Sequence, residues 1–177
     1  MNSKLKTQNS KLVFVALGSN LGDSRKILLA AMARLQEFSI IPVLKSSLWQ
    51  TSPVDCPPDS PKFVNAVAAL TPPANETPES LLEKMQALEI EFGRMPKKVL
   101  NEPRPLDLDL ILFGGEVRAS AALTLPHPRA HERRFVLQPL REIAPDLILP
   151  GQSQTVARLL AALPIDENCV KIAEATA

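Results

Sequence analysis

The octapeptide LDLDLILF at Leu106–Phe113 carries the clearest fold signal in this sequence. Leucine and aspartate alternate at its start, and a continuous apolar run follows. Alternation with a period of two is typical of a β-strand that has one buried face. We therefore predict a strand over Leu106–Phe113. The two glycines that follow, Gly114-Gly115, predict a hairpin turn, with Glu116–Arg118 beginning the return strand.

Further strands and helices are predicted on both sides of this segment. Three more strands are predicted: short apolar segments at Leu12–Leu17 and Phe63–Leu70, and the stretch 43–50, which follows the helix-blocking Pro42. Apolar residues at helical spacing predict a helix that starts at Asp23 or Ser24 and runs to about Phe38.

A second long helix has clear signals at both ends. Thr77 is its predicted N-cap, Pro78 occupies the first helical position, and Gly93 is placed for a left-handed C-terminal residue. Two shorter helices are predicted at Arg133–Ile143 and Thr155–Leu163.

The predicted order is β-α-β-β-α-β, followed by a hairpin and C-terminal helices. This order is typical of an α+β protein with a ferredoxin-like core, in which helices cover one face of a mainly antiparallel sheet. A chain of 177 residues fits one compact domain. We predict a flexible tail at 1–11, a single domain at 12–163 and a C-terminal tail at 164–177.

Composition and charge narrow the class of protein. Apolar residues make up 45% of the chain and charged residues 22%, and the formal net charge is only +1, which gives no support to a role in coating nucleic acid. Cys56 and Cys169 form no metal-type pattern, and residues 1–11 lack the apolar segment that export requires. We expect a cytoplasmic monomer with reduced thiols and with no membrane or nucleic-acid partner.

Asp107 and Asp109 are the first candidate site. They lie two positions apart on the predicted strand, so their carboxylates point to the same side and their backbones are roughly 6.5–7 Å apart. Such a pair can hold one or two hard cations bridged by phosphate oxygens. Taken alone, the pair is more simply an acidic, solvated strand face.

A basic segment leads directly onto these acids. Arg104 lies between Pro103 and Pro105, which stiffen the backbone and reduce the cost of orienting its side chain. The same connection also contains Arg94, Lys97 and Lys98. Cations beside paired acids are typical of a site that binds a polyphosphate together with its metal.

Three other segments give weaker signals. His127 and His131 have the i, i+4 spacing of a zinc helix, but Pro128 separates them and the catalytic Glu of H-E-x-x-H is missing. Two interpretations remain for this segment: phosphate binding by His127 and Arg133, or a plain surface turn. The loop 18–23 is not a Walker A sequence and is best interpreted as a tight strand-to-helix connection. The 51–65 segment has polar and aromatic groups suited to a flat heterocycle.

Four stretches together resemble the 6-hydroxymethyl-7,8-dihydropterin pyrophosphokinase family. They are VALGSNLGD at 15–23, the 51–65 segment together with FVNA at 63–66, PRPLDLD at 103–109 and PHPR at 126–129 with its continuation to Phe135. The resemblance extends from about residue 12 to residue 163. It implies an Mg²⁺-dependent enzyme of folate biosynthesis that transfers pyrophosphate from ATP to the hydroxymethyl group of the pterin and releases AMP.

The resemblance also implies roles for individual residues. Two Mg²⁺ ions would be held by Asp107 and Asp109, and Arg94 and Arg104 would bind and orient the polyphosphate, so that these four form the catalytic set. The residues implied to contact ATP are Gln86, Glu89, Arg104, Leu110, Thr124, His127 and Arg133. The residues implied to contact the pterin are Thr51, Ser52, Val54, Phe63, Asn65 and Phe135.

Some positions differ from the best-known form of the family. Pro96, Leu100 and Asn101 replace arginines and a tryptophan of a mobile loop, and Ala122 replaces an arginine. These differences predict weaker ATP binding or altered loop closure. The alternatives are a degenerate family member, a phosphotransferase with another acceptor, or a non-catalytic ferredoxin-like module, for instance for RNA. An RNA-binding sheet would expose aromatic residues on its central strands, where this chain has aspartates.

Overall fold

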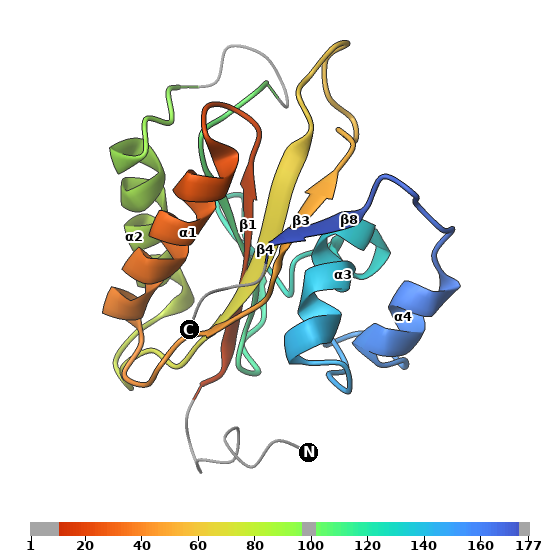
Figure 1. Ribbon diagram of the computed structural model, residues 1–177. Helices are drawn as coiled ribbons and strands as arrows, with labels where there is room; N and C mark the ends of the chain where they lie inside the picture. The colour runs from red at the N-terminus through yellow and green to blue at the C-terminus, as the bar shows by residue number, and fades with distance from the viewer. Residues whose placement is uncertain (1–10, 97–101, 174–177) are drawn as a thin grey trace.

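The computed structural model describes residues 11–96 and 102–173, and within these residues its main sheet has six strands. All the paired strands run antiparallel, with β1 (Val13–Ser19) between β5 (Asp107–Phe113) and β4 (Phe63–Leu70). The far side of β4 pairs with β3 (Leu48–Thr51) and with the short β2 (Leu44–Lys45). The α+β, ferredoxin-like architecture is confirmed (Figure 1).

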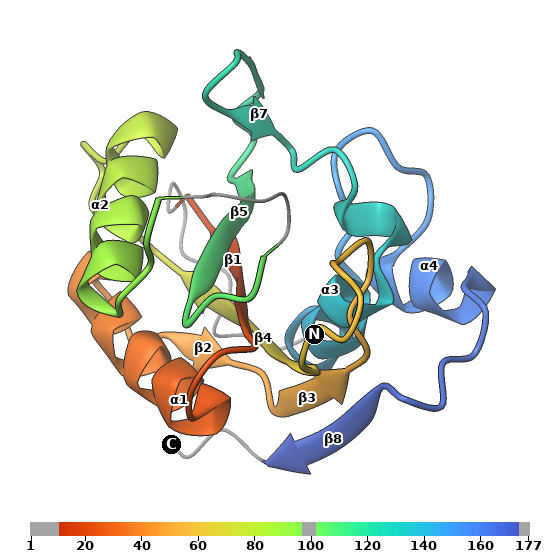
Figure 2. The ribbon, with the colours of Figure 1, turned by 90° about the horizontal axis from the view of Figure 1, so that it is seen from above.

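Helices cover both faces of this sheet. One face carries α1 (Ser24–Arg34), which continues as the 3₁₀ helix η2 (Leu35–Phe38), and α2 (Pro78–Glu91). The opposite face carries α3 (Arg134–Ile143) and α4 (Val156–Ala162), as Figure 2 shows. The predicted one-face arrangement therefore holds for α1 and α2, the helices of the ferredoxin-like core, and the C-terminal pair, for which no face was predicted, covers the other face.

The two hydrophobic cores explain why the central strands are apolar at almost every position. On β1, Val13, Val15 and Leu17 pack under α1 and α2, whereas Phe14 packs under α3 and α4. A strand that is buried on both faces has no solvent-facing side and needs no polar alternation.

The predicted limits of α2 are confirmed. The Thr77 side chain accepts a hydrogen bond from the backbone N–H of Ser80, and the Ser80 hydroxyl accepts one from the Thr77 N–H, which completes a capping box. Pro78 begins the helix, and Gly93 follows its end with a φ of +90°, a conformation that glycine adopts without strain.

Replacing Thr77 by alanine is expected to lower the free energy of unfolding by about 1 kcal/mol, because the orphan N–H groups of the first turn lose their acceptor. Chemical denaturation measures this difference directly. Thr77→Asn retains a side-chain acceptor and should keep near-wild-type stability. Equal losses in the two variants would show that the cap is not the cause.

The predicted strand at 43–50 is interrupted in the structure. Ser46 and Ser47 separate β2 from β3, and the Ser46 hydroxyl accepts a hydrogen bond from the Val67 N–H at 2.9 Å. The Ser47 N–H donates to the Glu142 carboxylate of α3 at 2.7 Å. These side-chain acceptors replace regular ladder bonds and allow the chain to bend within one sheet.

Two other expectations need correction. A turn forms at Gly114, but the following segment leaves the sheet: β6 (Arg118–Ala119) pairs with β7 (Thr124–Leu125), and Arg118 forms an ion pair with Glu79 of α2 at 2.5 Å. The predicted return strand beside β5 is therefore wrong. In the predicted C-terminal tail at 164–177, β8 (Val170–Ala173) adds a strand to β3, so these residues belong to the sheet.

Candidate functional site

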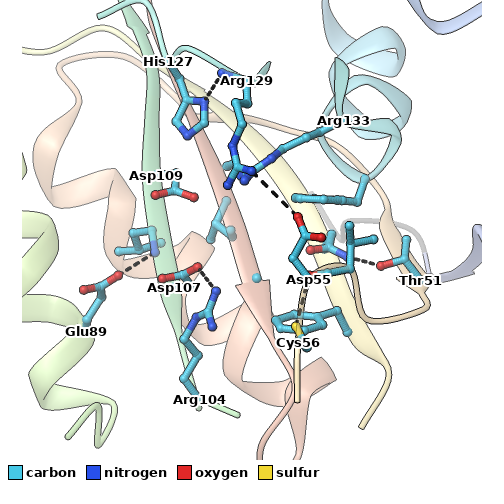
Figure 3. A pocket seen from close by; sticks show the side chains of 18 of the residues that line it. Thr51, Asp55, Cys56, Glu89, Arg104, Asp107, Asp109, His127, Arg129 and Arg133 are labelled. Atoms are coloured by element: carbon cyan, nitrogen blue, oxygen red, sulfur yellow. Dashed lines mark hydrogen bonds and ion pairs between the residues drawn. The ribbon is translucent and has the colours of Figure 1, made fainter. Parts of the chain in front are cut away.

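One cavity of about 480 Å³ opens where β1 ends and β4 and β5 begin, near α2 and the segment before α3 (Figure 3). The strand register determines what meets there. Gly18 of β1 lies opposite Asp107 on one side and Asn65 on the other. A Cβ atom at Gly18 would lie 3.4 Å from Asn65 Oδ1 and 3.9 Å from Asp107 Cβ, so glycine leaves the floor of the cavity open.

Asp107 is neutralised by two arginines from the 94–105 connection. Its Oδ1 lies 2.7 Å from Arg94 Nη1, and its Oδ2 lies 2.6 Å from Arg104 Nη2. The side chains of all three residues are 17–18% exposed. Charge-assisted pairs of this length hold both guanidinium groups in the cavity.

The backbone of Arg104 is fixed by the loop after β1. Its N–H donates to Asn20 Oδ1 at 2.9 Å, and its carbonyl accepts from the Asn20 N–H at 3.1 Å. The guanidinium carbon lies 5.5 Å from the centre of the Phe63 ring. Its buried Nε–H has no acceptor among the described residues, so a donor that an anion would satisfy is in place. The tight connection at 18–23 therefore positions Arg104.

Asp109 has a different environment. It forms no ion pair with any described residue, and burial raises its pKa, with the negative charge of Asp107 adding to the effect. A hard cation would relieve both effects, and carboxylate oxygens are the donors such a cation prefers. Among the described residues, no group of three or more His, Cys, Asp and Glu side chains could hold a metal. A cation held by Asp107 and Asp109 would take its other ligands from water and substrate oxygens.

Glu89 of α2 lies beside the acidic pair. Its Oε1 accepts the Leu108 N–H at 2.7 Å and forms an ion pair with Arg94. Burial raises the pKa of Glu89 to about 7, against the lowering effect of the Leu108 hydrogen bond and the Arg94 charge. The Glu89 carboxyl group therefore changes between its protonated and ionised forms near neutral pH.

The pH dependence of stability should reveal this group. The pKa of Glu89 is higher in the folded protein than its value of 4.5 in the unfolded chain. Glu89 therefore makes its full contribution to the free energy of unfolding below pH 4.5, and this contribution is lost as the pH rises through about 7. We expect wild type to lose roughly 1–3 kcal/mol of unfolding free energy relative to Glu89→Gln across this window. Urea unfolding at several pH values measures this loss. Glu83→Gln, an exposed control on the same helix, should run parallel to wild type. A parallel Glu89→Gln curve would contradict the assignment.

His127 and Arg133 reach the cavity from the segment before α3. The Arg129 N–H donates to His127 Nδ1 at 3.2 Å, so neutral His127 carries its proton on Nε2. Burial lowers the pKa of His127, which favours this neutral donor form. The Arg133 guanidinium lies 5.4 Å from the centre of the Phe135 ring. His131 does not line this cavity, so the two histidines do not form a zinc pair there.

The other wall of the cavity is polar and aromatic. The Asn65 amide nitrogen donates to Thr51 Oγ1 at 2.7 Å, and both residues are buried. Because strands β3 and β4 are paired, this bond holds the carboxamide in one orientation. The remaining predicted pterin residues also line the cavity: Ser52, Val54, Phe63 and Phe135.

The structure does not bring every predicted residue to this cavity. Leu110 is 4% exposed and lies in the core on the α1–α2 side of β5, and Thr124 is an exposed residue of β7. Gln86 lines the cavity from α2. Pro96 is exposed and lies outside it. The positions Lys97, Lys98, Leu100 and Asn101 lie outside the described residues.

Several lining residues were not predicted as site residues. They are Ala16, Leu17, Gly18, Asp55, Cys56, Leu82, Leu108, Ala122 and Arg129. Arg129 belongs to the basic segment that contains His127, so the sequence held a signal for it. Asp55 and Cys56 lie in a proline-rich loop and carried no such signal. Neither cysteine forms a disulfide.

No helix in the described part of the chain is long and apolar enough to cross a membrane.

Together, the ferredoxin-like sheet, paired carboxylates and converging arginines define a candidate polyphosphate-binding enzyme. The family model for 7,8-dihydro-6-hydroxymethylpterin-pyrophosphokinase matches residues 14–145, and the chain belongs to this family.

Related proteins agree with this assignment. The 2-amino-4-hydroxy-6-hydroxymethyldihydropteridine pyrophosphokinase of Pseudomonas aeruginosa is 43% identical over 87% of this chain and 93% of its own length. The protein of the same name from Haemophilus influenzae is 40% identical over 83% of this chain and 89% of its own. A crystal structure of Plasmodium falciparum HPPK-DHPS superposes with a TM-score of 0.70 at 13% identity, covering 94% of this chain. This chain spans half the length of that one, and the likeness shows the fold.

Proposed function

We propose that this protein transfers the pyrophosphate group of ATP to the hydroxymethyl oxygen of 6-hydroxymethyl-7,8-dihydropterin and releases AMP, as a step of folate biosynthesis. Family membership and two relatives of this name, matched over most of their length, support the proposal. One observation carries the proposal: Asp107 and Asp109 line the same cavity as a set of cationic side chains and a set of polar and aromatic side chains.

Asp107 and Asp109 would hold Mg²⁺, with two ions expected. The ions neutralise the negative charge of the phosphates when they are bound. Asp107 now has two arginine partners, Arg94 and Arg104. Metal at Asp107 would leave both guanidinium groups available to phosphate oxygens, which gives these arginines a role in binding and orienting the transferred group.

In this proposal the two sides of the cavity bind different substrates. Gln86 and Glu89 on α2, together with His127 and Arg133 on the facing segment, surround the polyphosphate and the rest of ATP. On the other wall the oriented carboxamide of Asn65 suits the donor and acceptor edge of a pterin, and two phenylalanine rings suit its flat face. Leu110 and Thr124 receive no role because they do not line the cavity.

Catalysis would then depend on position and charge. The hydroxymethyl oxygen attacks the β-phosphorus in line with the leaving AMP oxygen, and a reaction of this kind requires little covalent chemistry from the protein. The arginines stabilise the charge that develops on the transferred group. No side chain is assigned as a general base.

The test is a product analysis with ATP, Mg²⁺ and the dihydropterin. We expect AMP and pyrophosphorylated pterin in equal amounts, and we expect both to disappear when EDTA removes the metal. Release of ADP would contradict pyrophosphate transfer. The proposal also takes the enzyme to be a cytoplasmic monomer. Size-exclusion chromatography tests the monomeric state, and elution as a dimer would contradict it.

A further inference from the structure

Arg129 is a cation of the cavity that the resemblance does not use. It precedes the 3₁₀ helix η3 (Ala130–Glu132), and its side chain lines the same cavity as Asp109 and Arg133. Figure 3 shows its guanidinium group next to that of Arg133, on the wall opposite Arg104. Burial lowers the pKa of Arg133, and the repulsive charge of the neighbouring Arg129 lowers this pKa further.

The partner of Arg129 comes from the opposite side of the cavity. Asp55 lies in the 52–62 loop between β3 and β4, and its Oδ2 is 3.8 Å from Arg129 Nη1. This ion pair therefore connects the loop that carries Ser52 and Val54 to the wall that carries His127 (Figure 3). Both side chains are more than half exposed, at 54% for Arg129 and 69% for Asp55. An exposed pair at this distance is weak, so a more highly charged anion can replace the carboxylate at little cost.

We propose that Arg129 binds the polyphosphate of the nucleotide, and that Asp55 occupies Arg129 as a counter-ion until the nucleotide displaces it. This inference rests on the proposed function, since ATP is the anion that enters the cavity. Two neighbouring guanidinium groups near a cation-binding carboxylate form a site that a polyphosphate satisfies better than one aspartate does. When ATP binds, the 52–62 loop therefore loses the ion pair that joins it to the side of the cavity that carries Arg129 and His127.

The test measures the binding of α,β-methylene-ATP with Mg²⁺ by calorimetry. Arg129→Gln should weaken binding about tenfold, the size expected for one charge-assisted hydrogen-bonding group. Asp55→Asn should strengthen binding by about two- to fivefold, because it removes a weak competitor. In the double variant Asp55→Asn should have no further effect, because Arg129 is then absent. Arg141→Gln removes the same charge from an exposed site outside the cavity and should bind as wild type does.

Several outcomes would overturn the inference. Unchanged affinity in Arg129→Gln would show that Arg129 does not contact the nucleotide. Equal losses of thermal stability in Asp55→Asn and Arg129→Gln, with nucleotide affinity unchanged in both, would show that the pair only fixes the loop. Wild-type turnover separates this inference from the proposed function. If wild type forms AMP and pyrophosphorylated pterin while Arg129→Gln binds the nucleotide normally, only the role of Arg129 fails. If wild type neither binds the nucleotide nor forms these products, both fail.

Discussion

Asp109→Asn is expected to lower kcat by about a thousandfold or more while the protein stays folded. Asp109 is a partly buried carboxylate with no ion pair to any described residue, and its pKa is raised by burial and by the nearby Asp107. Asparagine has nearly the same shape but lacks the charge that, in the proposed function, would hold a metal ion against phosphate oxygens. A loss of this size corresponds to roughly 4 kcal/mol of transition-state stabilisation.

The stability of the Asp109→Asn variant should rise or stay unchanged, because a neutral amide costs less to bury than a carboxylate. Steady-state kinetics and chemical denaturation of the same sample measure both effects. Asp146→Asn, an exposed control outside the cavity, should match wild type in both measurements. Activity within tenfold of wild type would show that Asp109 does not hold a catalytic metal.

Arg104→Gln is expected to lower kcat/KM by about a hundredfold to a thousandfold. Arg104 pairs with Asp107 at 2.6 Å, and its buried Nε–H has no acceptor among the described residues. A preorganised cation with a free donor in a buried site suits charge that develops on the transferred group. Glutamine retains polarity but loses both the charge and the forked geometry.

Two further variants separate charge from geometry at this position. Arg104→Lys keeps the charge without the fork and should fall between wild type and Arg104→Gln. Arg118→Gln removes an arginine that pairs with Glu79 and Glu116 outside the cavity, and its kcat/KM should match that of wild type. A loss below threefold in Arg104→Gln would contradict a role in binding or orienting the polyphosphate.

Local sequence signals predicted most of the fold because they coincide with the long-range packing. The Thr77 cap, the Pro78 start and the Gly93 end of α2 each depend on a few neighbouring residues, and the structure contains all three. The Gly114-Gly115 signal failed because it specifies a turn and not the partner of the strand that follows. The structure pairs that strand with β7 and joins its Arg118 to Glu79 of α2, and a local turn signal specifies neither contact. The strand β8 was missed because its pairing with β3 connects residues far apart in the sequence.

The candidate site was predictable to the extent that motifs mark it. Asp107 and Arg104 belong to one short, distinctive segment, and the structure joins their side chains. Asp55 has no motif, and only the fold brings it to Arg129. Leu110 shows the opposite limit. The resemblance alone implied an ATP contact for Leu110, whereas strand alternation directs its side chain into the core, where the structure places it.

Isotope tracing tests the central claim, transfer of pyrophosphate as one unit, most directly. ATP carrying label on its β-phosphorus, supplied with Mg²⁺ and the dihydropterin, should give labelled pterin and unlabelled AMP. A parallel reaction with label on the α-phosphorus should give labelled AMP and unlabelled pterin. Retention of the β-label in a released nucleoside diphosphate would contradict the proposed reaction, because it would show transfer of the terminal phosphate alone.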